Sequence, residues 1–302
     1  MKKPKIKISI IVLASFAIVG FVLWIISDNE IFSTISGIAT IVSFFIGIYV
    51  FFREDKFEKL LEEIKKIQPQ DASESLKQEV RSAEERITNP TTADDFFLRA
   101  YVAHIDKNYD TAIKHYQKTI ELKPDFAAAY LNMGIVYNEK GNYDKAIEYY
   151  QKNIELKPDF VAAYLNMGTA YSNKGSYNKA IGYYQKAIEL EPDFAMAYNN
   201  IGAVYSVKGD YDKAIECCQK AIKLKPDFAE VYYNMGLVYR YKGNYDKAIE
   251  CYQKAIELKP NFAEAYDNMG IAYQHLDEQE KANYCFNKAD MIRHNESFTE
   301  YK

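Results

Sequence analysis

Residues 127–160 read AAAYLNMGIVYNEKGNYDKAIEYYQKNIELKPDF, and the chain writes close copies of this 34-residue stretch several times. Its segment KGNYDKAIE, residues 140–148, returns unchanged at residues 242–250, and near-copies begin at Lys174 and Lys208. A fixed period of about 20–50 residues is typical of proteins built from stacked structural repeats. The prolines keep the same period, at Pro124, Pro158, Pro192, Pro226 and Pro260.

One repeat encodes two helices joined by a glycine turn. Tyr130 and Tyr137 belong to a set of apolar and small residues at helical spacing, which predicts a first helix. Gly141 is expected to end that helix, and Asn142 can cap the second helix. Pro158 closes the repeat. Because a two-helix hairpin cannot bury its own apolar face, successive hairpins are expected to stack on one another.

The recurring positions resemble the tetratricopeptide repeat (TPR), whose pattern is an aromatic, a leucine-like residue, Gly, Tyr, Ala, an aromatic, Ala and Pro. Small departures are Asn153, where Ala is usual, and Cys218, which replaces an aromatic residue. The resemblance implies an all-α fold, a TPR α-solenoid in which helix–turn–helix repeats form a right-handed superhelix. The repeat that starts at Val161 shows the pattern in full, with Tyr164, Met167, Gly168, Tyr171, Ala180, Tyr184, Ala187 and Pro192.

The period defines six repeats and a short tail, residues 297–302. The first and last repeats are degenerate: Lys107 stands where the turn glycine is expected, and His294 stands where the proline is expected. Atypical terminal repeats are expected as caps of a stack. The repeats span residues 93–126, 127–160, 161–194, 195–228, 229–262 and 263–296.

Two uncharged apolar runs, residues 8–26 and 31–52, precede the repeats. Each is long enough to cross a hydrocarbon core of about 30 Å as a helix, so residues 1–52 are predicted to form two transmembrane helices. A cleaved signal peptide is the alternative, but the first run exceeds the roughly 7–15 residues of a signal-peptide core. Lysines flank the pair while the connecting turn is acidic, which predicts a multi-pass membrane protein with its N-terminus and TPR domain in the cytoplasm.

Residues 53–92 form a charged linker with two short amphipathic patterns. Pro69 separates them, and Asn89-Pro90 ends the second. The apolar stripes could pair as a coiled coil, lie on the lipid surface or cover the open end of the repeats. The stripes consist of Phe57, Leu60, Leu61, Ile64 and Ile67, followed by Leu76, Val80, Ala83 and Ile87.

The sequence carries no recognisable enzyme or metal motif. The net charge of −4 gives no reason to expect a nucleic-acid partner. The four histidines lack metal-ligand spacing, and there is no HExxH, GxSxG or GxxxxGK[ST] pattern. Cys217, Cys251 and Cys285 lie 34 residues apart and are expected to be packing residues, since equivalent sites in stacked repeats lie too far apart for disulfides. The chain is predicted not to be an enzyme and to need no cofactor.

The resemblance also implies where a partner would bind, because the first helix of each TPR lines a concave groove. The sixth position of five repeats is an asparagine, whose amide can bond a peptide main chain through one acceptor and two donors. Packing between repeats is the alternative role. The ninth position lacks the basic and amide residues of a carboxylate clamp. Predicted peptide-binding residues are Asn132, Asn166, Asn200, Asn234 and Asn268, with Tyr233 and Arg240 beside them.

Two functions follow from these expectations. The first is a membrane-anchored TPR scaffold that binds extended segments of partner proteins in its groove, and recruits or assembles them at a bilayer contacted through residues 8–52. The second is a structural homo-oligomer, which would assemble through the transmembrane hairpin, the linker or the solenoid ends.

Overall fold

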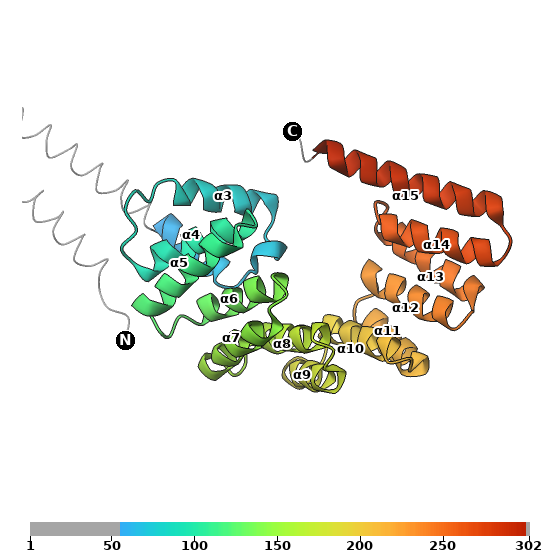
Figure 1. Ribbon diagram of the computed structural model, residues 1–302, viewed down its shortest axis with the longest axis horizontal. Helices are drawn as coiled ribbons and strands as arrows, with labels where there is room; N and C mark the ends of the chain where they lie inside the picture. Colours follow the sequence, from blue (N-terminus) through green and yellow to red (C-terminus); the bar gives the residue numbers. More distant parts are fainter. Residues whose placement is uncertain (1–54, 300–302) are drawn as a thin grey trace, which may run out of the picture. The chain divides into compact units, whose positions relative to one another are not determined.

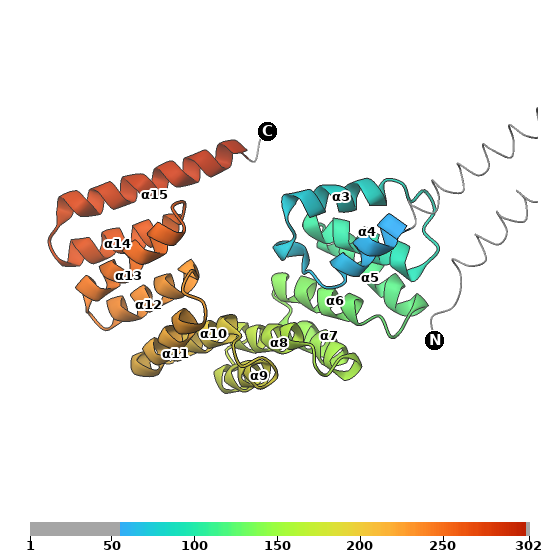
Figure 2. The same cartoon turned by 180° about the vertical axis from the view of Figure 1, so that it is seen from behind.

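The computed structural model describes residues 55–299, and within that range all regular elements are helices (Figures 1 and 2). The chain divides into two compact units between Thr111 and Ala112. We call the described parts of these the N-terminal unit, residues 55–111, and the C-terminal unit, residues 112–299. The predicted all-α TPR architecture is confirmed for this part of the chain.

The predicted transmembrane helices, residues 8–26 and 31–52, lie outside the described residues. Within residues 55–299, no helix combines the length and the apolar character that crossing a membrane requires. The longest of these helices, α15 (Gln279–Thr299), carries charged residues along its length. The expectation of a multi-pass membrane protein with a cytoplasmic N-terminus and TPR domain is therefore corrected: the structure gives a TPR solenoid without a membrane-spanning helix in its described part.

The N-terminal unit shows what the linker stripes cover. Residues 55–64 are helical, and the short 3-10 helix η1 (Pro69–Asp71) and helix α3 (Glu74–Glu84) follow. Both η1 and α3 contact α4 (Ala93–Ile105), the first helix of the first repeat. The Tyr101 hydroxyl of α4 donates to the Ile67 carbonyl at 3.2 Å, and Val80 of α3 is fully buried. Of the three arrangements considered for the linker, covering the repeats is the one that the structure shows.

The C-terminal unit is a stack of helix pairs in chain order (Figure 1). In each complete pair the first helix has 13 residues and the second has 14, as a strict sequence period requires. The elements are α5 (Tyr109–Leu122, which begins in the N-terminal unit), α6 (Ala127–Glu139), α7 (Tyr143–Leu156), α8 (Val161–Asn173), α9 (Tyr177–Leu190), α10 (Ala195–Val207), α11 (Tyr211–Leu224), α12 (Ala229–Tyr241), α13 (Tyr245–Leu258), α14 (Ala263–His275) and α15.

The turns between paired helices follow the sequence prediction. Gly141 has a φ of 74°, in the left-handed region that glycine enters without steric cost, and the equivalent glycines do the same. Asn142 then caps α7 by accepting from the Lys145 backbone N–H at 3.3 Å. In the degenerate end repeats, Lys107 and Asp277 take the left-handed conformation instead, with φ of 57° and 59°.

The first helices begin without a side-chain cap. Asp227 and Glu230 have the spacing of a capping box, yet the residue that directly precedes α12 is Phe228, which has no capping side chain. The Phe228 carbonyl accepts from the Val231 N–H at 3.1 Å, so the backbone itself makes the first turn. The acidic residue lies one position too early to cap the helix, and the same holds for the asparagine before α14.

The hydrophobic core lies between the helices and continues from one repeat to the next. One cluster joins Leu165 of α8, Tyr184 of α9 and Ile201 of α10, which come from two successive repeats. Within each pair the eighth-position glycine lies against the residue sixteen positions later. A Cβ on Gly168 would come within 2.5 Å of the Tyr184 ring, whereas one on Gly202 would come no closer than 3.2 Å to its neighbours.

Candidate peptide-binding groove

The first helices of the repeats form a continuous row in the C-terminal unit. Contacts between alternate helices concentrate on this row, which runs through α6, α8, α10, α12 and α14. Two hydrogen bonds reinforce it: Asn234 Nδ2 donates to Asn199 Oδ1 at 2.9 Å, and Asn268 Nδ2 donates to the Tyr233 hydroxyl at 3.2 Å. The first helices of successive repeats approach one another more closely than the second helices do. This row therefore lies on the inner, concave side of the stack.

The five asparagines of the predicted ladder do not share one environment. Asn132, the first of them, is only 2% exposed, and its neighbours Leu131 and Ile135 are also buried. Its amide is therefore not accessible to a partner in this structure, and Asn132 is not expected to contact a bound peptide.

Asn166 and Asn200 are the ladder members for which the fifth position of the preceding repeat is a leucine. Asn166 is partly exposed, but its Nδ2 is buried and makes no hydrogen bond within the described residues. Asn200 interacts with the Tyr184 hydroxyl, which also lies 3.2 Å from Thr169 Oγ1. Burial raises the pKa of Tyr184, and these two polar neighbours oppose the rise. The Asn200 amide thus already has a polar partner, whereas Asn166 Nδ2 has none within the described residues.

Asn234 and Asn268 already hold the repeats together. Each donates to the fifth position of the preceding repeat, Asn199 for the former and Tyr233 for the latter. Asn268 also donates to the Glu264 carbonyl at 2.9 Å. For Asn166 and Asn200 the fifth position of the preceding repeat is leucine, whose side chain offers no acceptor, so these asparagines have no such bond.

Tyr233 and Arg240 both belong to α12 and lie in an aromatic environment. The Tyr233 ring lies 6.0 Å from the ring of Tyr252 and 4.9 Å from that of Phe262. Burial raises the pKa of Tyr233, and the negative charge of Glu264 raises it further. The Arg240 guanidinium lies 4.8 Å from the ring centre of Tyr241.

The charge of the row changes along its length. The C-terminal part carries three carboxylates, of which Glu230 pairs with Lys259 at 3.4 Å and Asp267 pairs with Arg293. The third, Glu264, is exposed. On α6 and α8 the partly exposed residues are uncharged and include Ala128, Tyr130, Ala162, Tyr164, Asn166 and Thr169. A segment bound along this row would meet uncharged groups first and charged groups later.

Of the three cysteines predicted to be packing residues, Cys251 and Cys285 are buried, while Cys217 is partly buried and packs against a core cluster. Cys218 is also buried, and burial raises the pKa of Cys218 and Cys251 to about 12 and that of Cys285 to about 11. Such thiols stay protonated at neutral pH and are poor nucleophiles and metal ligands. Among residues 55–299, no group of three or more His, Cys, Asp or Glu side chains is placed to hold a metal ion.

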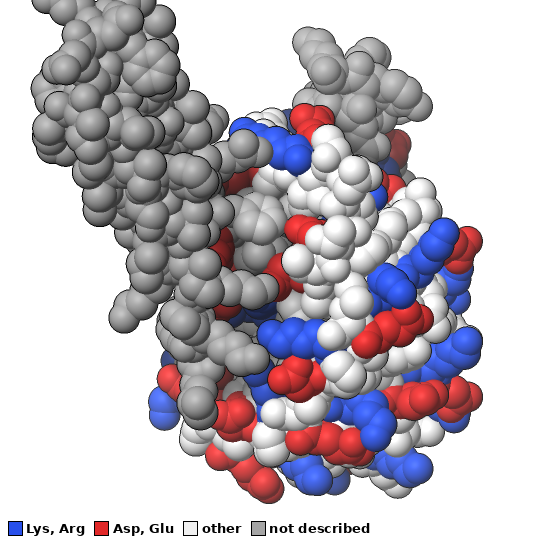
Figure 3. All heavy atoms as spheres, turned by 90° about the vertical axis from the view of Figure 1, so that its left-hand side faces the viewer, with Lys and Arg blue, Asp and Glu red and all other residues white. Residues whose placement is uncertain are grey.

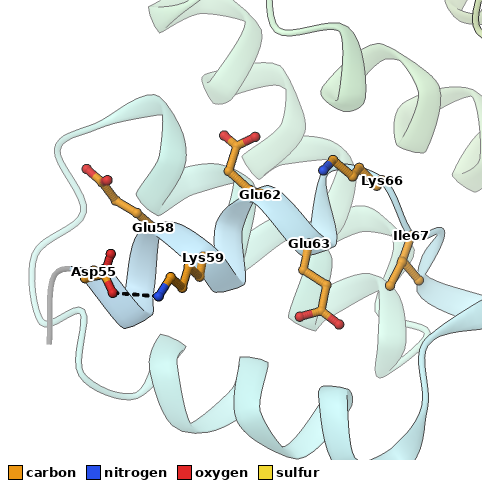
Figure 4. Close-up of a pocket in the computed structure, with 7 residues that line it drawn as sticks. All are labelled: Asp55, Glu58, Lys59, Glu62, Glu63, Lys66 and Ile67. Carbon is orange, nitrogen blue, oxygen red and sulfur yellow. Dashed lines mark ion pairs between the residues drawn. The ribbon is translucent and has the colours of Figure 1, made fainter. Parts of the chain in front are cut away.

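Other surfaces offer less. A hollow of about 450 Å³ is lined by residues of the segment 55–67. Its charged side chains all come from this one segment and point in different directions (Figure 4). Among the residues that Figure 4 labels, Asp55 and Lys59 form the one ion pair. On the face seen in Figure 3, basic and acidic side chains of the described residues alternate without a large area of one sign. Neither surface resembles a built binding site.

Comparisons with known proteins agree with this architecture. Models described as "Tetratricopeptide repeat" match residues 127–160, 161–194, 195–228, 229–262 and 251–282, and one described as "TPR repeat" matches residues 104–141. No curated protein matches the chain. Among solved structures, the crystal structure of MamA is 34% identical, with a TM-score of 0.47, and the match covers 55% of this chain and 96% of that one.

Two further solved structures are similar to this chain. The APC/C hetero-tetramer Cut9–Hcn1 is 22% identical with a TM-score of 0.62, covering 72% of this chain and 43% of that one, and it shows the fold. YrrB, whose structure is described as "a TPR protein with an unusual peptide-binding site", is 26% identical with a TM-score of 0.44, covering 61% of this chain and 94% of that one. The family models together span residues 104–282 of the 302. The chain belongs to the tetratricopeptide repeat family.

Proposed function

We propose that this protein is a non-enzymatic scaffold that binds an extended segment of a partner protein along its first-helix row and so brings partner proteins together. The carrying observation is Asn166, whose Nδ2 is a buried donor without a hydrogen bond among the described residues. A buried polar group left unpaired costs about 1–3 kcal/mol. A peptide carbonyl would satisfy this donor after a small rotation of the partly exposed amide.

Asn200, whose amide already interacts with the Tyr184 hydroxyl, is the second amide expected to contact the peptide, through a donor or acceptor that this interaction leaves over. It lies one repeat further along the row, so an extended chain could meet both amides in succession. The residues beside them carry no charge: Leu131 and Leu165 are buried, and Thr169 and Ala203 are partly exposed. Main-chain hydrogen bonds give affinity whatever the sequence of the segment, and an uncharged surface disfavours a charged side chain at this point.

The alternative function, a homo-oligomer assembled through the solenoid ends, has little support at the C-terminal end of the stack. The α13 residues that meet the next repeat include Ile249 and Ile256, which pack in the core. At the equivalent positions α15 has Asn283 and Asp290. A polar outer face is what a capping helix needs and does not favour stacking of another repeat on it.

The test is binding of peptides selected from random dodecapeptides displayed on phage, with the full chain as bait. The double variant Asn166→Ala, Asn200→Ala should bind a selected synthetic peptide roughly tenfold to a hundredfold more weakly, since each neutral hydrogen bond contributes about 0.5–1.5 kcal/mol. Isothermal titration measures the affinity, and circular dichroism checks the fold.

Asn234→Ala is the matched control. It removes the same side chain from the same repeat position, but the Nδ2 of Asn234 already donates a hydrogen bond to Asn199 Oδ1. It should therefore lower the melting temperature slightly and leave affinity nearly unchanged. Full affinity in a folded double variant would assign the asparagines to packing alone.

A further inference from the structure

A hollow of about 360 Å³ lies near the C-terminal end of the stack, where α14 meets α13 and α15. Its volume is within the range of sites that bind small groups, and none of the ladder asparagines lines it. It is therefore a different place from the first-helix row. The lining includes Gln253 of α13, Met269 and Tyr273 of α14, and Lys281, Tyr284 and Cys285 of α15.

The same frame of side chains occurs three repeats earlier in the chain. The residues equivalent to Gln253, Met269, Tyr273 and Lys281 are of identical type there. The repeat at residues 161–194 differs at the position of Cys285, where it has Tyr183. The residues of this earlier frame are Gln151, Met167, Tyr171 and Lys179.

In the earlier frame a tyrosine ring occupies the place that corresponds to the hollow. The Tyr183 ring stacks on Tyr171, with 5.3 Å between the ring centres and 11° between the planes. The repeat before it does the same: Tyr149 stacks on Tyr137 at 5.4 Å and 7°. Two repeats of this chain thus show that an aromatic ring fits against the tyrosine of the frame, in a favourable stacked arrangement.

The lysine of the frame does not compete with the stacked ring. Lys179 Nζ lies 5.3 Å from the ring centre of Tyr171, which at the same time stacks on Tyr183. Lys281 Nζ lies at the same distance, 5.3 Å, from the ring centre of Tyr273. A ring can therefore be added at Tyr273 while Lys281 stays in place.

In the last repeat the side chains of α15 leave this place open. Cys285 is short and only 1% exposed, so it forms the inner end of the hollow. Tyr284 also lines the hollow but is 58% exposed, so its ring stands at the rim and does not fill it. The other two repeats with cysteine at this position have Glu216 and Glu250 in place of Tyr284, and so lack this second ring.

The charges at the hollow favour a neutral occupant. Lys281 already pairs with Glu278, so it does not call for an anion. The equivalent Tyr183 is partly exposed, which shows that a ring in this position is reachable from solvent. Met269 adds a polarisable thioether, a group that makes favourable contacts with aromatic rings.

We propose that this hollow binds the aromatic ring of one tyrosine or phenylalanine side chain of a partner protein. The ring stacks on Tyr273 between Met269 and Tyr284, and so replaces the tyrosine that earlier repeats supply themselves. The site is independent of the first-helix row, so the protein has two places at which partners can dock.

The probe is N-acetyl-tyrosinamide, which carries one tyrosine side chain between two peptide groups, added to the full chain labelled with ¹³C in its methionine methyl groups. The ring current of a bound ring should shift the Met269 methyl resonance, with a dissociation constant on the order of 1 mM for so small a ligand. Met269→Leu assigns the resonance. Met167, which is fully buried, is the internal control and should not shift.

Two variants exchange the key residue between the repeats. Cys285→Tyr supplies the missing ring, so it should abolish the Met269 response and leave the melting temperature unchanged or higher. Tyr183→Cys removes the ring from the earlier frame, so Met167 should begin to respond to N-acetyl-tyrosinamide. If Cys285→Tyr folds poorly, Tyr183→Cys still tests whether the vacated place accepts a ring.

Three results would overturn the site. One is the lack of a saturable Met269 shift at 20 times the expected dissociation constant, about 20 mM. Another is an equal shift with N-acetyl-leucinamide, which has no ring. A Met269 resonance that moves with protein concentration alone would assign the hollow to a second copy of this chain. None of these bears on the first-helix row, which is tested through Asn166 and Asn200.

Discussion

Gly168→Ala should lower the free energy of unfolding of the C-terminal unit by about 2–3 kcal/mol, because the new methyl group has no room. Its carbon would lie 2.5 Å from Cε1 of Tyr184, well inside van der Waals contact. That tyrosine is 2% exposed and packed among residues of two repeats, so it cannot swing aside. Urea unfolding followed by circular dichroism measures the loss.

Gly202→Ala is the matched control, since it makes the same change at the same repeat position. Here the facing residue is Cys218, and the nearest atoms to the new methyl group lie 3.2 Å away. We expect a loss below about 1 kcal/mol. The double variant Gly168→Ala, Tyr184→Cys places a cysteine opposite residue 168, as Cys218 lies opposite Gly202. The smaller side chain leaves room for the new methyl group, so the double variant should recover part of the lost stability. Equal losses in the two glycine variants would show that the hairpin adjusts elsewhere.

The repeat pattern predicts a small residue at the eighth position of each repeat, but not how tightly each glycine is packed. The period predicts that the eighth position must be small, because two helices approach there in every repeat. How tightly each site is packed depends on the residue sixteen positions later, which is tyrosine in one hairpin and cysteine in another. That information is in the sequence, but it appears only when positions are compared across the hairpin.

The asparagines at the sixth position differ in their hydrogen bonds although they share one repeat position. One residue type at one repeat position suggests one role, yet the structure gives Asn166 an unpaired donor among the described residues and Asn234 a bond to Asn199. The difference comes from the residue 35 positions earlier, Leu131 for the first and Asn199 for the second. Bonds between repeats depend on neighbours from two repeats, so a pattern read within one repeat cannot predict them.

The linker could not be placed by periodicity at all. Its stripes predict amphipathic helices, but an apolar stripe does not say which surface it meets. The contacts of α3 and η1 with α4 are long-range, and their specificity comes from pairs such as Arg81 with Asp106, which lie 2.7 Å apart. No local rule of turn or helix chemistry encodes such a pairing.

Val80→Asp tests whether this cover is an integral part of the fold. Val80 is fully buried on α3, so the substitution places a carboxylate where water does not reach it. We expect the N-terminal unit to lose about 3–5 kcal/mol of stability, the range for burying an uncompensated charge. Hydrogen exchange read by mass spectrometry should speed up across residues 55–105.

Val207→Asp makes the same chemical change where the valine is 66% exposed, and it should alter stability by no more than about 0.5 kcal/mol. The two variants should also differ in pH dependence. Burial disfavours the charged form, so the carboxyl group introduced by Val80→Asp should have a folded-state pKa above its unfolded value of about 3.9. The destabilisation should therefore be smallest at pH values below that and grow as pH rises towards the folded-state pKa. Unchanged exchange in Val80→Asp at neutral pH would mean that α3 rests only loosely on α4.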